Sequence, residues 1–463
     1  GKTTVLTEKM VYAIHELGVE ADRILAITFT NKAANEMRER VKSLLKDHQV
    51  FPLVSTFHGF SLQVLRRYAE RLGLDPQFSI LDSGDQRQLM KRLMKELNMD
   101  EAVYPIGSTL SRYDYARNCE LDQSKVLDQF SDQRHIDLLN RYESEKKRRS
   151  HVDFNDLLVM MVRLFNDFPD VLERYQDQFP FVFVDEYQDT NTIQYKFINM
   201  LASRFQNLVV VGDFDQNIYS WRGADVQNIL DFERDYPNAK VIKLEQNYRS
   251  TQTILEAANA VIKYNTQRKD KRLWTDNGKG EPIFVREHGD DRSEANVLAD
   301  RIKENGAERY GETAILIRTN AQSRVLESAL ADKSIAYRLI GAQRFFDRAE
   351  VKDVLAYLRI LIAPQDDLAV SRILNRPTRG IGQTTIDQLN RDARLAGMSL
   401  FQFMSGDLLH YSGRARNAIK AFVTLIEPFA NRFKDVSPAD CLKELLDAVH
   451  LIDFIKKQDP AKA

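Results

Sequence analysis

Two groups of residues far apart in this 463-residue chain have the types and spacing for phosphate chemistry. Gly1-Lys2-Thr3 matches the end of the pattern G-x-x-x-x-G-K-[ST], in which the Lys contacts the β- and γ-phosphates and the hydroxyl binds Mg²⁺. Asp185 and Glu186 follow the apolar run 181–184, which is typical of a buried strand. At a strand end Asp185 suits Mg²⁺ and Glu186 suits a general base that orients water. An exposed acidic turn is the alternative, but Gly-Lys-Thr favours a nucleotide site.

Polar and aromatic residues follow another apolar run, 208–211. The neutral amide of Gln216 could sense a γ-phosphate. Tyr219 and Trp221 lie two residues apart and are followed by Arg222, which is the combination that base stacking on a single strand needs, at ~1–3 kcal/mol per stacked base. The alternative for both rings is core packing.

A third pair follows the run 241–244. Arg249 could stabilise the charge of a transferring γ-phosphoryl group, and Tyr248 could stack on a base. The alternative for Arg249 is a surface salt bridge.

The elements that must position these residues are predicted from apolar runs. Strands are expected at 23–29, 181–184, 208–211 and 241–244, and their continuous apolar character predicts an α/β doubly wound parallel sheet. Asn31 is expected to cap the helix after the first strand. A second α/β unit is expected from strands at 313–318 and 335–340 around a helix that Asn320 caps. Residues 83–179 and those from about 350 onward are expected to be helical.

Composition limits the class of protein. Net charge is −1, so any nucleic-acid site must be a local groove rather than a basic tail. Two cysteines and the absence of a long apolar run exclude a disulfide scaffold and a membrane-spanning segment. The basic run 141–150 is interpreted as a solvated helix face, with contact to a nucleic-acid backbone as the alternative.

Five ordered segments closely resemble the UvrD/PcrA/Rep family of superfamily 1A DNA helicases, with the PcrA/UvrD branch nearest; they are Ile24–Met37, Thr56–Phe60, Asp185–Asn191, Val210–Ala224 and Gln246–Thr251. The resemblance implies two RecA-like domains of the P-loop NTPase class, each with a mostly helical insertion. It implies an ATP-dependent 3′→5′ DNA helicase or translocase that uses ATP and Mg²⁺, moves on single-stranded DNA and acts in DNA repair or replication.

The resemblance also assigns roles by position. Gly1, Lys2, Thr3 and Thr4 match the phosphate loop, where Thr4 stands in place of the usual Arg; Thr3 and Asp185 match the Mg²⁺ ligands, Glu186 the water-activating residue, Gln216 the γ-phosphate sensor, Arg249 an arginine finger and Tyr248 the ring on adenine. The DNA groove would include Phe29, Thr56, His58, Tyr219, Trp221, Arg222, Arg318 and Asn320. A turn with Thr378, Arg379, Gly380 and Gly382 would contact duplex DNA, unless it is only a connection between helices.

The implied domain boundaries are 1–82 with 180–243 for the first motor domain, 83–179 for its helical insertion, 244–348 for the first part of the second motor domain and 349–463 for the second insertion. The second motor domain and its insertion are expected to be incomplete, because the later family motifs are absent from this sequence. The first part of the phosphate loop, which belongs to the first motor domain, is absent as well. The chain is therefore interpreted as an incomplete helicase.

Two other functions stay open. One is a non-catalytic fragment that binds single-stranded DNA, and ATP hydrolysis by this chain distinguishes it from the motor. The other is the helicase subunit of a RecB/AddA-type helicase–nuclease. The expected partners are single-stranded DNA, junctions of single- and double-stranded DNA, and repair or replication proteins, with no membrane, in the bacterial cytosol at the nucleoid.

Overall fold

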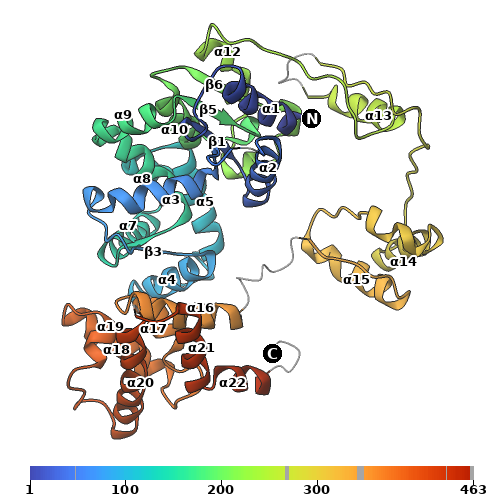
Figure 1. The fold of residues 1–463 in the computed structure, drawn as a ribbon. Coiled ribbons are helices and arrows are strands. Elements are labelled where there is room, and N and C mark those ends of the chain that lie inside the picture. The colour runs from blue at the N-terminus through green and yellow to red at the C-terminus, as the bar shows by residue number, and fades with distance from the viewer. Residues whose placement is uncertain (47, 266–270, 341–348, 434, 459–463) are drawn as a thin grey trace. The chain divides into compact units, whose positions relative to one another are not determined.

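The computed structural model describes residues 1–463 except 47, 266–270, 341–348, 434 and 459–463, and it leaves the side chains of Asn320 and Gln458 undescribed (Figure 1). The chain forms two compact units, Gly1–Ile283 and Phe284–Ala463. None of the described helices is long and apolar enough to cross a membrane.

A four-stranded parallel sheet lies in the first unit (Figure 1), in the order β2-β1-β5-β6; its strands are β1 (Ile24–Thr28), β2 (Leu53–Thr56), β5 (Phe181–Val184) and β6 (Asn207–Val210). All neighbouring pairs are parallel, so the strands end at one edge. The prediction of a parallel sheet is confirmed, and β1, β5 and β6 match three of the predicted strands. The edge strand β2 was not predicted, because its residues alternate between buried and half-buried.

Helices cover both faces of this sheet because alternate strand residues point to opposite sides. On one face Ile24 and Ala26 pack with Leu6 of α1 (Lys2–His15) and Met37 of α2 (Asn31–Leu44). On the other face Leu25, Ile27 and Val182 pack with residues of α3 (Phe57–Tyr68), α8 (Phe154–Asp167), α9 (Pro169–Gln178) and α10 (Thr192–Ala202).

Helix α2 begins directly after the carboxyl end of β1, as expected, but its cap differs from the prediction. The Thr30 hydroxyl accepts a hydrogen bond from the Ala33 amide at 3.1 Å, so Thr30 is the N-cap and Asn31 is the first helical residue. Thr30 has the extended backbone that a capping residue requires, whereas Asn31 has already entered the helix.

The chain between β2 and β5 is mostly helical, as predicted; besides α3, α8 and α9 it contains α4 (Ser83–Glu96), α5 (Ile106–Cys119), α6 (Gln123–Leu127) and α7 (Gln133–Arg148). Two short parallel strands, β3 (Ser79–Ile80) and β4 (His151–Val152), also lie in this region. The prediction for 83–179 did not include β4, because a two-residue strand leaves no periodic pattern.

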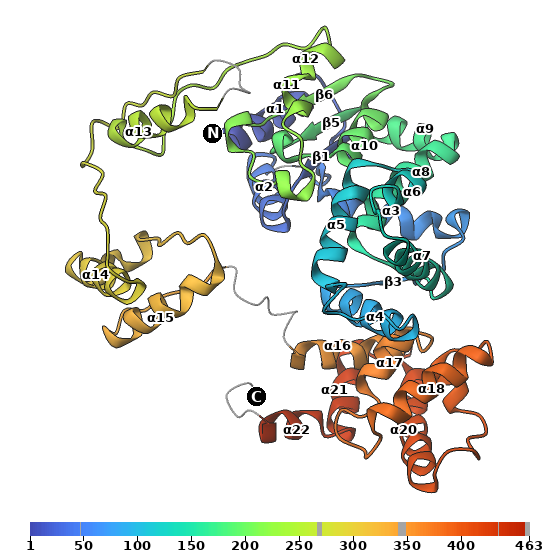
Figure 2. The same ribbon diagram turned by 180° about the vertical axis from the view of Figure 1, so that it is seen from behind.

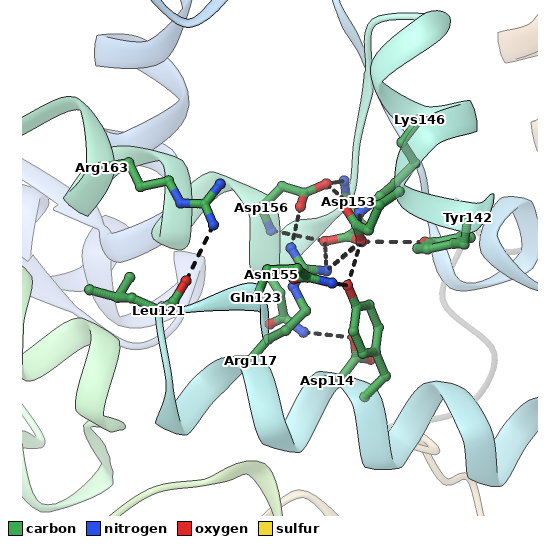
Figure 3. A network of polar contacts seen from close by, with 12 residues as sticks. Asp114, Arg117, Leu121, Gln123, Tyr142, Lys146, Asp153, Asn155, Asp156 and Arg163 are labelled. Atoms are coloured by element: carbon green, nitrogen blue, oxygen red, sulfur yellow. Dashed lines mark hydrogen bonds and ion pairs between the residues drawn. The ribbon is translucent and has the colours of Figure 1, made fainter. Parts of the chain in front are cut away.

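A buried network of charges joins these helices (Figure 3). The Lys146 ammonium donates to Asp153 at 2.6 Å and to Asp156 at 2.8 Å, and it also pairs with Glu143. Arg117 of α5 donates to Asp153 at 2.9 Å and pairs with Asp156. Burial alone would lower the pKa of Lys146, but the three carboxylates raise it, so this ammonium stays charged.

The network corrects the interpretation of 141–150 as a solvated face. The Lys146 side chain is only 2% exposed. Arg148 and Arg149 both pair with the buried Glu145, at 3.0 and 2.9 Å, and thus serve the fold. Glu143, Asp153 and Asp156 lie close enough to share a metal ion, but Lys146 and Arg117 already neutralise them.

The remainder of the first unit contains short helices and irregular backbone; its elements are η1 (Ala21–Arg23), η2 (Ala69–Leu72), η3 (Tyr187–Asp189), η4 (Phe214–Gln216), η5 (Ser220–Arg222), α11 (Gln227–Leu230), α12 (Phe232–Asp235) and α13 (Gln252–Ile262). The predicted strand at 241–244 is wrong. Ile242 is 68% exposed, and the described residues offer this run no neighbouring strand, without which a strand cannot satisfy its backbone groups.

The second unit is helical in its described part (Figure 2); it contains α14 (Asp291–Glu304), η6 (Ala307–Glu312), η7 (Asn320–Gln322), α15 (Ser323–Asp332), α16 (Ala349–Ile362), α17 (Asp367–Ile373), α18 (Gln383–Leu395), α19 (Leu400–Met404), α20 (Gly413–Arg432), α21 (Pro438–Ala448) and α22 (Leu451–Gln458). The helical prediction from about 350 onward is confirmed, and α16–α21 share one hydrophobic core. The predicted strands at 313–318 and 335–340 are wrong. Leu316 is 94% and Ile340 84% exposed, and no described strand pairs with either run.

The network predicts that Lys146→Met destabilises the first unit by about 3–5 kcal/mol, because removing one partner leaves buried carboxylates without their cation. Lys147→Met is the matched control, since the neighbouring Lys147 side chain is exposed and should contribute less than about 0.5 kcal/mol. Urea unfolding measures both. Equal stabilities of the two variants would contradict the prediction.

Candidate functional site

The structure brings together four predicted residues, which we call the phosphate cluster: Lys2, Thr3, Asp185 and Glu186. The Lys2 Nζ donates to the Glu186 Oε2 at 2.8 Å, and the Thr3 hydroxyl donates to the Asp185 Oδ2 at 3.1 Å. These pairs join the first turn of α1 to the residues that follow β5. Two sequence segments more than 180 residues apart thus form one site.

The backbone beside this cluster adds a partial positive charge. Gly1 is the N-cap of α1, and the amides of the first helical turn have no partners within the helix. The aligned peptide dipoles favour an anion at this end. Gly1 is exposed, and no other atom lies within 4 Å of where a Cβ would be. A phosphate could therefore reach both the amides and the Lys2 ammonium.

The two carboxylates occupy different environments. The Asp185 amide donates to Ile27 of β1 at 2.9 Å, which fixes the start of the turn. Burial and the neighbouring Glu186 raise the pKa of Asp185. Glu186 has a φ of +51°, a left-handed conformation that is uncommon for a residue with a side chain. Such backbone strain concentrates at functional sites.

Gln188, which had no predicted role, connects the phosphate cluster to the loop after β6. Its Nε2 donates to Glu186 at 2.9 Å and to Asp189 at 3.2 Å, and its Oε1 accepts from the Asp213 amide at 2.8 Å. A Cβ on Gly212 would lie 2.7 Å from that Oε1, so a larger residue at this position would displace the Gln188 side chain. The sequence signal was a polar residue two positions after the second of two strand-end carboxylates.

Among the described residues, a chain of hydrogen bonds that passes through Gln188 connects Gln216 to the cluster. Its Nε2 donates to Asp213 at 2.7 Å, and Asp213 is bonded through its amide to Gln188. Asp189, which also accepts a hydrogen bond from Gln188, has its pKa raised to about 6 by burial and by the neighbouring Glu186. The loop after β6 is therefore connected to Glu186 by side-chain amides.

Thr4 has a partner that the sequence did not indicate. The Thr4 hydroxyl accepts from the Arg40 Nη1 at 3.1 Å, which brings a guanidinium of α2 beside the phosphate cluster. Nothing in the local sequence around Arg40 indicated this contact, which depends on how α1 packs against α2.

The predicted stacking residues also gather, in what we call the aromatic cluster: Phe29, His58, Tyr219, Trp221 and Arg222. Phe29 and Tyr219 stack with ring centroids 5.0 Å apart. The Arg222 guanidinium lies 4.5 Å from the Trp221 ring and 5.7 Å from the Tyr219 ring. Trp221 is 66% exposed, which excludes core packing for this ring and leaves its face available.

His58 and Thr56 lie where β2 passes into α3. The His58 ring packs edge-on against Phe154 at 6.0 Å, and burial together with Arg222 lowers its pKa to about 4. Thr56 is 7% exposed, and its hydroxyl accepts from the Gly59 amide at 3.1 Å. The Thr56 side chain is therefore used as a helix cap.

Tyr248 and Arg249 are exposed, and their hydrogen bonds go to neighbouring residues of the chain. The Tyr248 hydroxyl donates to Gln246 at 2.6 Å, and the Arg249 amide donates to Asn247 at 2.9 Å. Within the described part of the chain, no hydrogen bond or ion pair joins either residue to Lys2, Asp185 or Glu186.

The other predicted DNA contacts lie in the second unit. Arg318 is exposed, and the Asn320 side chain lies outside the described residues. Thr378, Gly380 and Gly382 are exposed in the turn before α18. Arg379 differs, because its guanidinium donates to Ile373 at 2.9 Å and to the Tyr357 hydroxyl at 2.8 Å, so this side chain holds the turn together.

The histidine environment predicts that His58 is neutral at pH 7 and titrates near pH 4. Because its folded pKa lies below the ordinary value near 6.5, protonation favours the unfolded chain, and stability falls as the pH drops from 6.5 toward 4. NMR titration of the histidine side chains measures this, with His58→Gln identifying the resonance. A midpoint near 6.5 would contradict the assigned environment.

Two family models match the chain. The UvrD/REP helicase N-terminal domain matches residues 1–237, and the UvrD-like helicase C-terminal domain matches residues 242–432. The chain is 43% identical to the ATP-dependent DNA helicase PcrA of Bacillus subtilis (strain 168), over all of this chain and 64% of the relative.

Two further relatives carry the same name. The chain is 43% identical to the ATP-dependent DNA helicase PcrA of Leuconostoc citreum over 93% of this chain and 58% of the relative, and 40% identical to that of Staphylococcus aureus (strain Mu50) over 99% and 64%. The chain thus spans less than two thirds of the length of these relatives.

Proposed function

Because this chain belongs to the UvrD/REP helicase family, we propose that it is the ATP-hydrolysing and DNA-gripping part of a 3′→5′ DNA helicase. The observation that carries this proposal is the phosphate cluster, in which Lys2 contacts Glu186 and Thr3 contacts Asp185 at the carboxyl edge of a parallel sheet. Open α/β sheets bind their ligands at this edge.

Each residue of the cluster has a distinct task in this proposal. The Lys2 ammonium neutralises the β- and γ-phosphates and exchanges its contact with Glu186 for them when ATP binds. Glu186 then accepts a proton from the attacking water. The α1 amides after Gly1 bind phosphate oxygens, and Thr4 borders the same end of the helix.

The residues present fit Mg²⁺. The Thr3 hydroxyl and an Asp185 carboxylate oxygen lie 3.1 Å apart, and hard oxygen ligands are those that Mg²⁺ prefers. Thr3 and Asp185 would hold the ion, which neutralises phosphate charge when bound.

Other residues respond to the γ-phosphate in this proposal. Gln216 senses it through the chain Asp213–Gln188–Glu186, whose hydrogen bonds run directly to the proposed base. Arg249 supplies positive charge to the transferring phosphoryl group, and Tyr248 stacks on adenine. The exposure of Arg249 and Tyr248 supports these two roles, because it leaves both side chains available to a nucleotide.

The aromatic cluster is the proposed grip on single-stranded DNA. Trp221 and Tyr219 offer ring faces to bases, Phe29 backs Tyr219, and Arg222 attracts phosphates. His58 stays neutral and lines the same surface. Arg318, Asn320 and the turn residues Thr378, Gly380 and Gly382 would extend the contact, with Arg379 shaping the turn and Thr56 capping α3.

The domain organisation is part of the proposal. Residues 1–82 and 180–243 would form one RecA-like motor domain with the insertion 83–179, and 244–348 would begin a second, with the insertion 349–463.

Movement would follow from different DNA affinities of the ATP-bound and ATP-free states, since only such a difference lets a ligand shift a conformation. Junctions of single- and double-stranded DNA are the proposed substrate, in repair or replication in the bacterial cytosol at the nucleoid. Repair or replication proteins are the proposed partners.

Glu186→Gln is expected to lower DNA-stimulated ATP hydrolysis by about 10²-fold or more, because the amide cannot accept a proton from water. ATP binding should persist. Glu8→Gln is the control, since Glu8 is exposed on the same helix that carries Lys2. Turnover near that of the parent would refute the base assignment, and a parent chain without ATP hydrolysis would favour the non-catalytic DNA-binding alternative.

Trp221→Ala is expected to weaken binding of oligo(dT) by about 5- to 150-fold, the equivalent of one lost stack of ~1–3 kcal/mol. Phe205→Ala is the control, because Phe205 is also an exposed ring but precedes β6 at the opposite edge of the sheet. Fluorescence anisotropy measures both. Unchanged affinity in Trp221→Ala would remove the ring from the DNA site.

A further inference from the structure

The η5 turn, which carries Trp221 and Arg222, has little to hold it internally. It is a three-residue helix closed by the hydrogen bonds from the Arg222 amide to Tyr219 at 2.8 Å and from the Gly223 amide to Ser220 at 2.9 Å. Both of its large side chains are exposed. A turn of this kind takes its orientation from whatever contacts its backbone.

Asn118, at the end of α5 in the helical region, makes that contact. Its Nδ2 donates to the Arg222 carbonyl at 3.0 Å, and its Oδ1 accepts from the Asn191 Nδ2 at 3.0 Å. The packing is close, since a Cβ on Gly223 would lie 3.0 Å from the Asn118 Cβ. One amide side chain therefore joins the aromatic turn to the segment that ends at Asn191.

That segment begins at the phosphate cluster and is held by local hydrogen bonds. It runs from Asp185 through Thr190, whose hydroxyl donates to the Tyr187 carbonyl at 2.7 Å, to Asn191, which caps α10 through its bond to the Gln194 amide at 2.8 Å. The Asn191 Oδ1 serves this cap, so its Nδ2 serves Asn118. A displacement of Glu186 can thus reach Asn118 through a short, hydrogen-bonded stretch.

We infer that Asn118 is a positioning residue that transmits changes at the phosphate cluster to the aromatic turn. This inference rests on the proposed function. Asn118 touches neither group that performs the chemistry, so its loss should leave nucleotide binding intact and uncouple Trp221 from the nucleotide. Further links hold the two segments together when Asn118 is changed: the Asp225 amide and the Asn228 Nδ2 both donate to the Thr190 carbonyl at 3.0 Å, and Asn191 forms an isolated bridge with Ala224. These links join residues that follow η5, whereas Asn118 bonds to the η5 backbone itself.

Trp221 itself reports the coupling. The chain has two tryptophans, and the described hydrogen bonds of Trp274 use backbone atoms, so Trp274→Phe gives a parent in which Trp221 alone emits. A non-hydrolysable ATP analogue with Mg²⁺ is added to the 463-residue chain, and calorimetry measures its affinity separately. In the parent we expect the Trp221 emission to change when the analogue binds.

Asn118→Ala should keep the analogue affinity within about twofold and the melting temperature of the parent, while the Trp221 response falls about fivefold or more. Asn118→Asp keeps the shape and the acceptor for Asn191 but cannot donate to the Arg222 carbonyl, so it should lose the response as well. Ser111→Ala, an exposed position on the same helix, should respond like the parent.

Two results would overturn the inference: a normal Trp221 response in both Asn118 variants, or a parent that binds the analogue without any response. If the parent binds no analogue in the calorimeter, the proposed function is contradicted, and the inference that rests on it is contradicted as well. Reduced DNA activation of ATP hydrolysis in Asn118→Ala, with unchanged hydrolysis in the absence of DNA, would support it independently.

Discussion

The contact between the first turn of α1 and the residues after β5 is the constraint on which the candidate site depends. Parallel strands β1 and β5 end at the same edge, so the turn that starts at Asp185 lies beside the helix start that carries Lys2 and Thr3. The cluster places one ammonium beside one carboxylate and a neutral hydroxyl beside the other, and burial together with Glu186 raises the pKa of Asp185. The Lys2–Glu186 ion pair is partly exposed, so it contributes only modestly to stability.

From that edge, hydrogen-bonded segments connect the phosphate cluster to other surfaces. Gln188 joins Glu186 to the loop after β6, and Asn191 joins the same turn to α5 through Asn118. Both connections use side-chain amides, which donate and accept at once and here each bridge a backbone group and a side chain of another segment. Glu186, with its left-handed φ, lies at the start of the segment that runs from Asp185 to Asn191.

A buried network of charges crosses the helical region between β2 and β5, which also contains the two-stranded sheet of β3 and β4. Lys146 and Arg117 hold three carboxylates from α7 and the start of α8, and burial makes each partner dependent on the others. This network fixes α5, whose last turn carries Asn118. The basic run that the sequence presents as a surface feature thus stabilises the interior, while Glu145 binds Arg148 and Arg149.

The sequence alone determined the strands β1, β5 and β6, since apolar runs report burial on both faces, and it located Asp185, Glu186, Trp221 and Lys2 by residue type. Only the tertiary structure decided the partners. Sheet order and helix packing, which no local pattern encodes, determine that Thr3 contacts Asp185 and that Arg40 contacts Thr4. They also determine that the side chains of Arg379 and Thr56 are used in local structure. The strand predictions at 241–244, 313–318 and 335–340 failed for the same reason: an apolar run becomes a strand only when a neighbour satisfies its backbone, and the described residues place none beside these runs.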